Sequence, residues 1–194
     1  MKRIAISQRI ELIPDRDEKR DVLDHRLVSW VGHCGFSPLP VPNVLSHMVE
    51  NWLLDIQPDG ILLSGGGDIG QFSERDETER LLLSFASRFN LPVLGICRGM
   101  QFMAHLSGAT LYPVTGHVGT RHCLNGKISL ERNSYHEYSI SHCPKPFEII
   151  ARSEDGVIEA IRHLSLPWEG WMWHPERERV YSQDDISRLL KLFQ

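Results

Sequence analysis

The residues most suited to chemistry lie around Cys97, which stands between two glycines at the end of an apolar run. The run and the residues after it read PVLGICRGMQ over positions 92–101. The Gly95-x-Cys97-x-Gly99 spacing has the design of a nucleophile elbow, a sharp strand-to-helix turn, with a thiol in place of the usual hydroxyl. The start of the following helix favours a thiolate, because its unpaired N–H groups and dipole stabilise negative charge. We therefore predict that Cys97 is a nucleophile.

A nucleophilic thiol needs a general base and a group that orients this base. His174 follows the apolar segment 171–173 and precedes a proline, so we expect it at the end of a strand. Glu176 lies two residues further along and is close enough to hold the imidazole. Two interpretations of His174 are equally favoured by these residues alone. One is a catalytic base, and the other is a strand-end histidine that makes a structural hydrogen bond.

Three consecutive glycines, Gly65, Gly66 and Gly67, follow another predicted strand. Their backbone N–H groups, with that of Arg98, are suited to an oxyanion hole, which stabilises the charge that develops during acyl transfer. A flexible turn is the structural alternative. A nucleotide-phosphate loop is disfavoured, because neither the G-x-G-x-x-G pattern nor the P-loop pattern is present.

The order of the predicted elements indicates an α/β fold. In the first half, strands at 4–7, 39–41, 59–63 and 92–96 alternate with helices at 17–32, 44–55, 74–89 and 98–106. This alternation predicts a flavodoxin-like open, mostly parallel sheet with helices on both faces. Ligands bind at the carboxyl ends of the strands in such sheets, so the glycines and Cys97 are expected to share a cleft.

The second half has a different pattern. Short strands are predicted at 127–131, 147–152, 157–163 and 168–173, and a closing helix at 184–193 with Ser182 as its cap. These strands predict an antiparallel extension of the sheet. We find no internal repeat or linker, so residues 1–194 are expected to form a single domain.

Composition narrows the class of protein. The net charge is −4 and no long basic run is present, which disfavours a nucleic-acid partner. The start, MKRIAISQRI, is not typical of a signal peptide, and no apolar stretch approaches the ~20 residues that span a membrane. We therefore expect a cytoplasmic protein with free thiols at its four widely spaced cysteines. The oligomeric state is left open.

Other polar residues carry weaker signals. The histidines and cysteines between positions 117 and 143 follow no familiar zinc spacing, so we expect no metal and no other cofactor. His117 and Arg121 are candidates for the wall of the cleft, with solvent-exposed loop residues as the alternative. Arg98 directly follows the nucleophile, and its cation is suited to lowering the thiol pKa or meeting an anionic leaving group.

Taken together, these motifs resemble the class I glutamine amidotransferase domain, and more narrowly its stand-alone γ-glutamyl hydrolase branch. The resemblance rests on the segments around Cys97, around the glycines and around His174. Further matching segments follow in the same order, at 75–79, 108–112, 133–136 and 155–160.

The resemblance implies a Cys97–His174–Glu176 triad. The thiol would attack a γ-glutamyl carbonyl, form a glutamyl thioester, and release glutamate after hydrolysis. It also implies that backbone N–H groups of the three glycines and of Arg98 stabilise the oxyanion. Gln101 and the backbone of Ser134, Tyr135 and His136 would hold the amino and carboxylate ends of the glutamyl group.

The chain also departs from the pattern of this family. The loop 69–74 is short, Glu137 and Tyr138 replace a common His-Gln pair, and Met172 replaces a common glutamine. These changes concern the substrate rather than the triad. The short loop and the arginines at 75, 98 and 121 favour an anionic, nucleotide-linked leaving group.

The predicted partner is thus a small γ-glutamyl molecule, with γ-glutamyl-CDP-amidate as the first candidate. The alternative is a glutaminase subunit that passes ammonia to a separate synthetase. A non-catalytic binding domain is disfavoured, because a nucleophile, a base and an orienting acid are all present.

Overall fold

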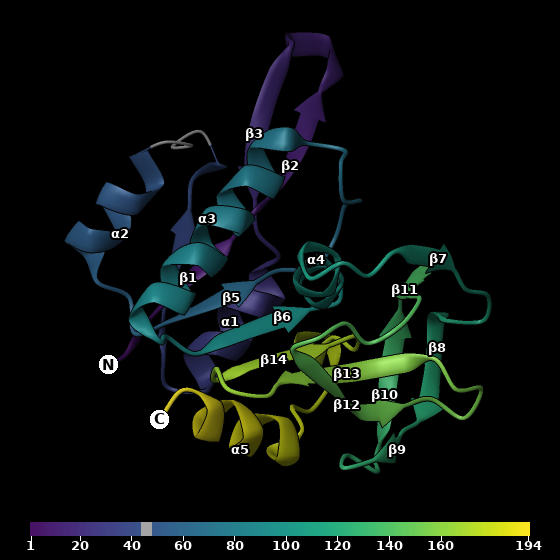
Figure 1. Cartoon of the computed structure of the whole chain (residues 1–194). Helices are drawn as coiled ribbons and strands as arrows, with labels where there is room; N and C mark the ends of the chain where they lie inside the picture. Colours follow the sequence, from purple (N-terminus) through teal and green to yellow (C-terminus); the bar gives the residue numbers. More distant parts are fainter. Residues whose placement is uncertain (44–47) are drawn as a thin grey trace.

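A computed structural model describes residues 1–43 and 48–194. Its centre is an eight-stranded sheet of order β4-β1-β5-β6-β14-β13-β12-β9 (Figure 1). Five neighbouring strands are parallel: β4 (Ser37–Val41), β1 (Arg3–Ser7), β5 (Gly60–Leu63), β6 (Val93–Ile96) and β14 (Trp168–Trp171). Three more continue the sheet in antiparallel pairings: β13 (Ile158–His163), β12 (Phe147–Arg152) and β9 (Asn125–Gly126). The predicted open, mostly parallel sheet with an antiparallel extension is confirmed.

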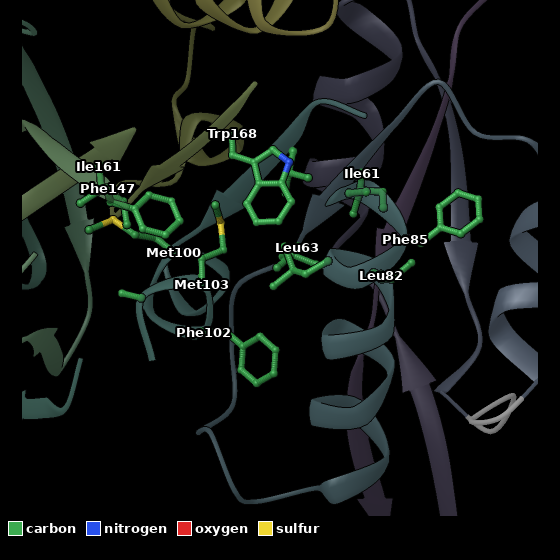
Figure 2. Packing of buried hydrophobic residues seen from close by; sticks show 14 of the residues in the cluster. Ile61, Leu63, Leu82, Phe85, Met100, Phe102, Met103, Phe147, Ile161 and Trp168 are labelled. Carbon is green, nitrogen blue, oxygen red and sulfur yellow. The ribbon is translucent and has the colours of Figure 1, made fainter. Parts of the chain in front are cut away.

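Helices cover both faces of this sheet, because alternate strand residues point to opposite sides. Ile61 and Leu63 pack with the helices of one face, namely α2 (Val49–Ile56), α3 (Ser73–Phe89) and α4 (Arg98–Leu106). Figure 2 shows Met100 and Met103 of α4 in this layer, near Trp168. Leu62 packs on the other face with α1 (His25–His33) and α5 (Gln183–Leu192).

The predicted helix at 17–32 is wrong in its first half. That part of the chain belongs to a hairpin of β2 (Arg9–Ile13) and β3 (Glu18–Val22), which projects from the body of the molecule (Figure 1). A 3-10 turn over Pro14–Arg16 and a left-handed Asp17 (φ 50°) reverse the chain between the two strands. The helix begins only at His25, because the side chain of Asp24 accepts a hydrogen bond from the N–H of Arg26 (2.9 Å) and caps it.

The strand predicted at 127–131 is also wrong. The N–H groups of Lys127 and Ile128 both donate to the carbonyl of Ile150, so this stretch forms an irregular connection rather than a ladder. Two small antiparallel sheets were not predicted, β8 (Val118–Cys123) with β10 (Glu131–Tyr135) and β7 (Leu111–Pro113) with β11 (Tyr138–Ile140).

The helix predicted at 44–55 is confirmed from Val49 onward, and positions 44–47 lie outside the described residues. None of the helices described combines the length and the apolar character needed to cross a bilayer.

Candidate active site

Cys97 occupies the predicted strand-to-helix turn between β6 and α4. Its backbone has φ 51° and ψ −105°, a left-handed φ that is unusual for a residue other than glycine. The N–H of Cys97 donates to the carbonyl of Trp171 (2.7 Å), which ties the turn to β14. A Cβ atom on Gly95 would come within 2.6 Å of the carbonyl carbon of Gly99. Both glycines are therefore needed for the helix to lie this close to the strand.

His174 and the glycine loop meet the thiol at the carboxyl ends of the strands. His174 follows β14, and it lines the same cleft as the thiol of Cys97. A Cβ atom on Gly65 would lie 2.7 Å from His174 Cε1 and 3.6 Å from Cys97 Cβ. The three predicted segments thus converge on one point, although the thiol and the imidazole are far apart in the sequence.

Glu176 orients this imidazole. It lies in a 3-10 turn over Pro175–Arg177, and its Oε1 is 2.6 Å from Nδ1 of His174. Burial lowers the pKa of His174, whereas the hydrogen bonds with Cys97 and Glu176 raise it, and the resulting pKa is about 9. The imidazole is therefore protonated at neutral pH, which suits it to donate a proton to a leaving group.

Asn133 on β10 fixes the backbone of His174, a role that was not predicted. The His174 N–H donates to Asn133 Oδ1 (2.9 Å), and Asn133 Nδ2 donates to the His174 carbonyl (2.8 Å). Asn133 belongs to the segment 133–136 that supported the family resemblance. The contact of Asn133 with His174 is visible only in the tertiary structure, where β10 lies beside the end of β14.

Arg75 shapes the glycine loop. Its guanidinium donates to the carbonyls of Ser64 (2.8 Å), Gly65 (3.4 Å) and Gly66. In a trans peptide the N–H points opposite to the carbonyl. The N–H groups of Gly66 and Gly67 are therefore turned away from Arg75. Both residues have left-handed φ values, 82° and 73°, that glycine adopts without strain.

The expectation that Arg75 and Arg98 meet an anionic leaving group is wrong. Both guanidinium groups are buried and bind the buried carboxylate of Glu79, and Arg98 also binds Asp76. Glu79 accepts a further hydrogen bond from Ser7 Oγ (2.9 Å). The two cations are neutralised inside the protein, because a buried charge without a partner is costly.

Arg121 and His117 do not line the cleft either. Arg121 is exposed on β8, and its guanidinium pairs with Glu131 (3.1 Å) and Glu178 (3.0 Å). His117 is buried and faces Glu159 rather than the thiol. Both candidates lie outside the cavity wall that the described residues form.

The cleft beside Cys97 has a volume of about 210 Å³. Gln101, Tyr135 and His136 line it, and Gln101 Nε2 donates to the carbonyl of Tyr138 (2.8 Å). Ser134 lies behind the residues that line the cleft. Its buried Oγ donates to the carbonyl of His117 (2.7 Å).

Two arginines that were not predicted lie at the site, each near a carboxylate: Arg9 pairs with Glu11 (2.8 Å), and Arg177 lies 3.8 Å from Glu176. Arg177 lines the cleft with its guanidinium 4.6 Å from the ring centroid of Tyr135. Arg9 reaches the glycine loop from β2, where its side chain approaches within 3.4 Å of the Cβ position of Gly66. A cationic residue directly after the His-Pro-Glu segment was visible in the sequence, but the place of Arg9 depends on the hairpin.

Comparison with known proteins identifies the family of the chain. The family model described as glutamine amidotransferase class-I matches residues 20–188. The γ-glutamyl-CDP-amidate hydrolase of Campylobacter jejuni is 29% identical, over 95% of each chain. The glutamine-hydrolyzing GMP synthase subunit of Methanothrix thermoacetophila is 34% identical over 71% of this chain and 78% of its own.

A solved structure supports the same fold. A protein of Thermoplasma acidophilum, described as a putative GMP synthase subunit, superimposes with a TM-score of 0.73 at 21% identity, over 100% of this chain and 92% of its own. The family match spans most of the length of the chain. The chain belongs to the class-I glutamine amidotransferase family.

Proposed function

We propose that this protein is a cysteine-dependent hydrolase that cleaves γ-glutamyl amide bonds. The observation that carries the proposal is the convergence of the strained Cys97, the imidazole of His174 and the Gly65 backbone at one point. A thiol, a base and nearby backbone N–H groups are the parts that acyl transfer needs.

In the first step the Cys97 sulfur attacks the γ-carbonyl carbon, and its proton resides on His174. The oxygen of the tetrahedral intermediate receives hydrogen bonds from the backbone N–H groups of the glycine loop and of Arg98. The C–N bond then breaks while His174 donates its proton to the departing nitrogen. Glu176 holds the imidazole in position, and a glutamyl thioester remains on Cys97.

In the second step water attacks the thioester carbonyl and His174 accepts the proton of this water. The C–S bond breaks, glutamate leaves, and the thiol and imidazole return to their starting state. Splitting the amide cleavage in this way replaces one difficult step by two easier ones. Gln101 and the backbone of Ser134, Tyr135 and His136 hold the glutamyl end during both steps.

We further propose an anionic leaving group, with γ-glutamyl-CDP-amidate as the first candidate. Arg177 and Arg9 support it, because both line a pocket beside His174 and the glycine loop. The name of the Campylobacter jejuni relative supports it as well. Guanidinium groups are well suited to bind phosphate oxygens.

The test is a substrate comparison with the purified chain. Glutamate release is measured from γ-glutamyl-CDP-amidate, from γ-glutamylamines and from glutamine. We expect the anionic substrate to have the highest kcat/KM, and Cys97→Ala to lower it about 10,000-fold or more. Cys123→Ala is the matched control, because this thiol is exposed on β8. The variant should retain full activity. Full activity of Cys97→Ala would overturn the mechanism.

The second candidate function is a glutaminase subunit that supplies ammonia to a separate synthetase. It is favoured by the relatives described as glutamine-hydrolyzing GMP synthase subunits. In that case the isolated chain should turn over none of the larger γ-glutamyl compounds, and glutamine hydrolysis should begin only when a synthetase is added.

A further inference from the structure

Three buried side chains converge beside the cleft, and the proposed reaction uses none of these three side chains. His117 lies just before β8, His136 directly follows β10, and Glu159 lies on β13; each is at most 3% exposed. Glu159 Oε1 is 3.4 Å from His117 Nδ1 and 3.3 Å from His136 Nε2. All three atoms lie within 4.8 Å of one another.

The outer nitrogens of both histidines already have partners. His117 Nε2 lies 2.9 Å from a carboxylate oxygen of Asp155, and His136 Nδ1 lies 3.0 Å from the carbonyl of Tyr138. Both of these oxygens accept, so each outer nitrogen donates its N–H. The inner nitrogens, His117 Nδ1 and His136 Nε2, face the Glu159 carboxylate.

The contact between His136 Nε2 and Glu159 Oε1 is a long hydrogen bond (3.3 Å). His117 Nδ1 has no hydrogen-bond partner within the described part of the chain, although it is fully enclosed. A histidine that binds a metal characteristically donates its other N–H to a carboxylate or a backbone carbonyl, as both of these do. The hydrogen bonds that surround the cluster are therefore typical of a site that binds a metal cation.

The two distances from Glu159 Oε1 also fit a metal ion. A charge-assisted imidazole–carboxylate hydrogen bond is shorter, as the 2.6 Å contact of His174 with Glu176 illustrates. Nitrogen and oxygen ligands lie about 2.0–2.2 Å from Zn²⁺, so neighbouring ligands of a tetrahedral ion are about 3.3–3.6 Å apart. The separations of 3.3 and 3.4 Å fall in this range.

We infer that His117, His136 and Glu159 bind one divalent transition-metal ion of the Zn²⁺ type. Two imidazoles and one carboxylate are a ligand set that suits Zn²⁺, and a fourth position remains for water. Glu159 lies on β13 and the two histidines lie at the ends of β8 and β10, which explains why their sequence spacing follows no familiar zinc pattern. The ion would tie these strands together and hold the Tyr138 carbonyl that receives the hydrogen bond of Gln101.

Metal binding to the full chain tests this inference directly. The protein is dialysed against a chelator and then supplied with Zn²⁺ or Co²⁺ alone. We expect one ion per chain by elemental analysis and the d–d absorption of a tetrahedral Co²⁺ site. At a free Zn²⁺ concentration about 100 times Kd, Tm should rise by about 5–10 °C.

Variants locate the ion. Glu159→Gln and His117→Gln should weaken binding of Zn²⁺ at least about 100-fold. Asp155→Asn alters an exposed residue whose carboxylate orients His117 and accepts a hydrogen bond from Ser153. It should keep the fold, as far-UV circular dichroism checks, and weaken binding about tenfold. His142→Gln is the matched control, because this histidine is exposed and should leave binding unchanged.

A second control separates this site from the reactive thiol, which itself has affinity for Zn²⁺. Cys97→Ser should still bind one ion per chain with the same Kd. The inference is overturned if the wild-type chain binds no ion, if Asp155→Asn binds as tightly as the wild type, or if Cys97→Ser is the variant that loses the ion. None of these results depends on the hydrolase activity.

Discussion

Asn133 holds His174 through two hydrogen bonds to one backbone position, one to its N–H (2.9 Å) and one from Nδ2 to its carbonyl (2.8 Å). Both residues are buried, so neither of these backbone groups has water as a substitute. The position of the proposed catalytic base thus depends on a side chain from a different sheet.

Asn133→Ala should lower kcat about 10- to 100-fold with little change in KM, because the imidazole loses its fixed position while the glutamyl contacts remain. Each backbone group left unsatisfied also costs about 1–3 kcal/mol of stability. Steady-state kinetics and urea unfolding measure the two effects. Asn125→Ala, an exposed change on β9, should affect neither; equal kcat in both variants would contradict the proposed role.

Gly65→Ala should abolish most activity without unfolding the protein. The new methyl group would lie 2.7 Å from His174 Cε1, so the imidazole must move away from the thiol. We expect kcat to fall about 100-fold or more. Gly32→Ala is the control, because nothing lies within 4 Å of its Cβ position and alanine favours the helix there. A normal kcat in Gly65→Ala would argue against this arrangement.

Glu79→Gln should destabilise the protein strongly. Its carboxylate neutralises both Arg75 and Arg98 in the interior, and its loss leaves two buried cations with reduced compensation. Breaking a buried pair costs about 3–5 kcal/mol in free energy of unfolding. Glu77→Gln is the matched control on the same helix. Its side chain is largely solvent-accessible and pairs with Arg80, so the free energy of unfolding should fall by less than about 1 kcal/mol. Denaturant titration of both variants distinguishes the two cases.

The pH dependence of kcat/KM should follow the raised pKa of His174. Since this pKa is about 9, the imidazolium persists through neutral pH and is lost only as the pH rises through about 9. The alkaline limb of the profile should lie there. Glu176→Gln removes a group that raises this pKa, so the limb should move to lower pH. An alkaline limb that is identical in both proteins would show that another group titrates.

Arg177→Gln should lower kcat/KM for an anionic γ-glutamyl substrate about 10- to 100-fold. This loss corresponds to the free energy of one charge-assisted hydrogen bond. Glutamine, which has no charge in its leaving group, should be affected much less. Arg179→Gln is the matched control, since this arginine is exposed two residues further along. A uniform loss with both substrates would indicate a structural role for Arg177 instead.

The reactive segments could be predicted from short stretches of the chain. The Gly-x-Cys97-x-Gly turn, the three glycines and the His174-x-Glu176 pair are all defined by residues a few positions apart, and the turn, the loop and the hydrogen bond they predict are present. The alternating order of strands and helices likewise predicted the mostly parallel sheet, because hydrophobic periodicity and end signals are local.

Which charged side chains can reach a substrate, and which strands flank the thiol, could be seen only in the folded protein. Arg98 is adjacent to the nucleophile in sequence, yet Glu79, 19 residues away, removes its charge from the site. Arg9 reaches the glycine loop only because a hairpin forms where a helix was predicted, and His117, His136 and Glu159 meet only when three strands are assembled. Ion pairs and cross-strand contacts depend on the order and register of the strands, and these are properties of the whole chain rather than of any short segment.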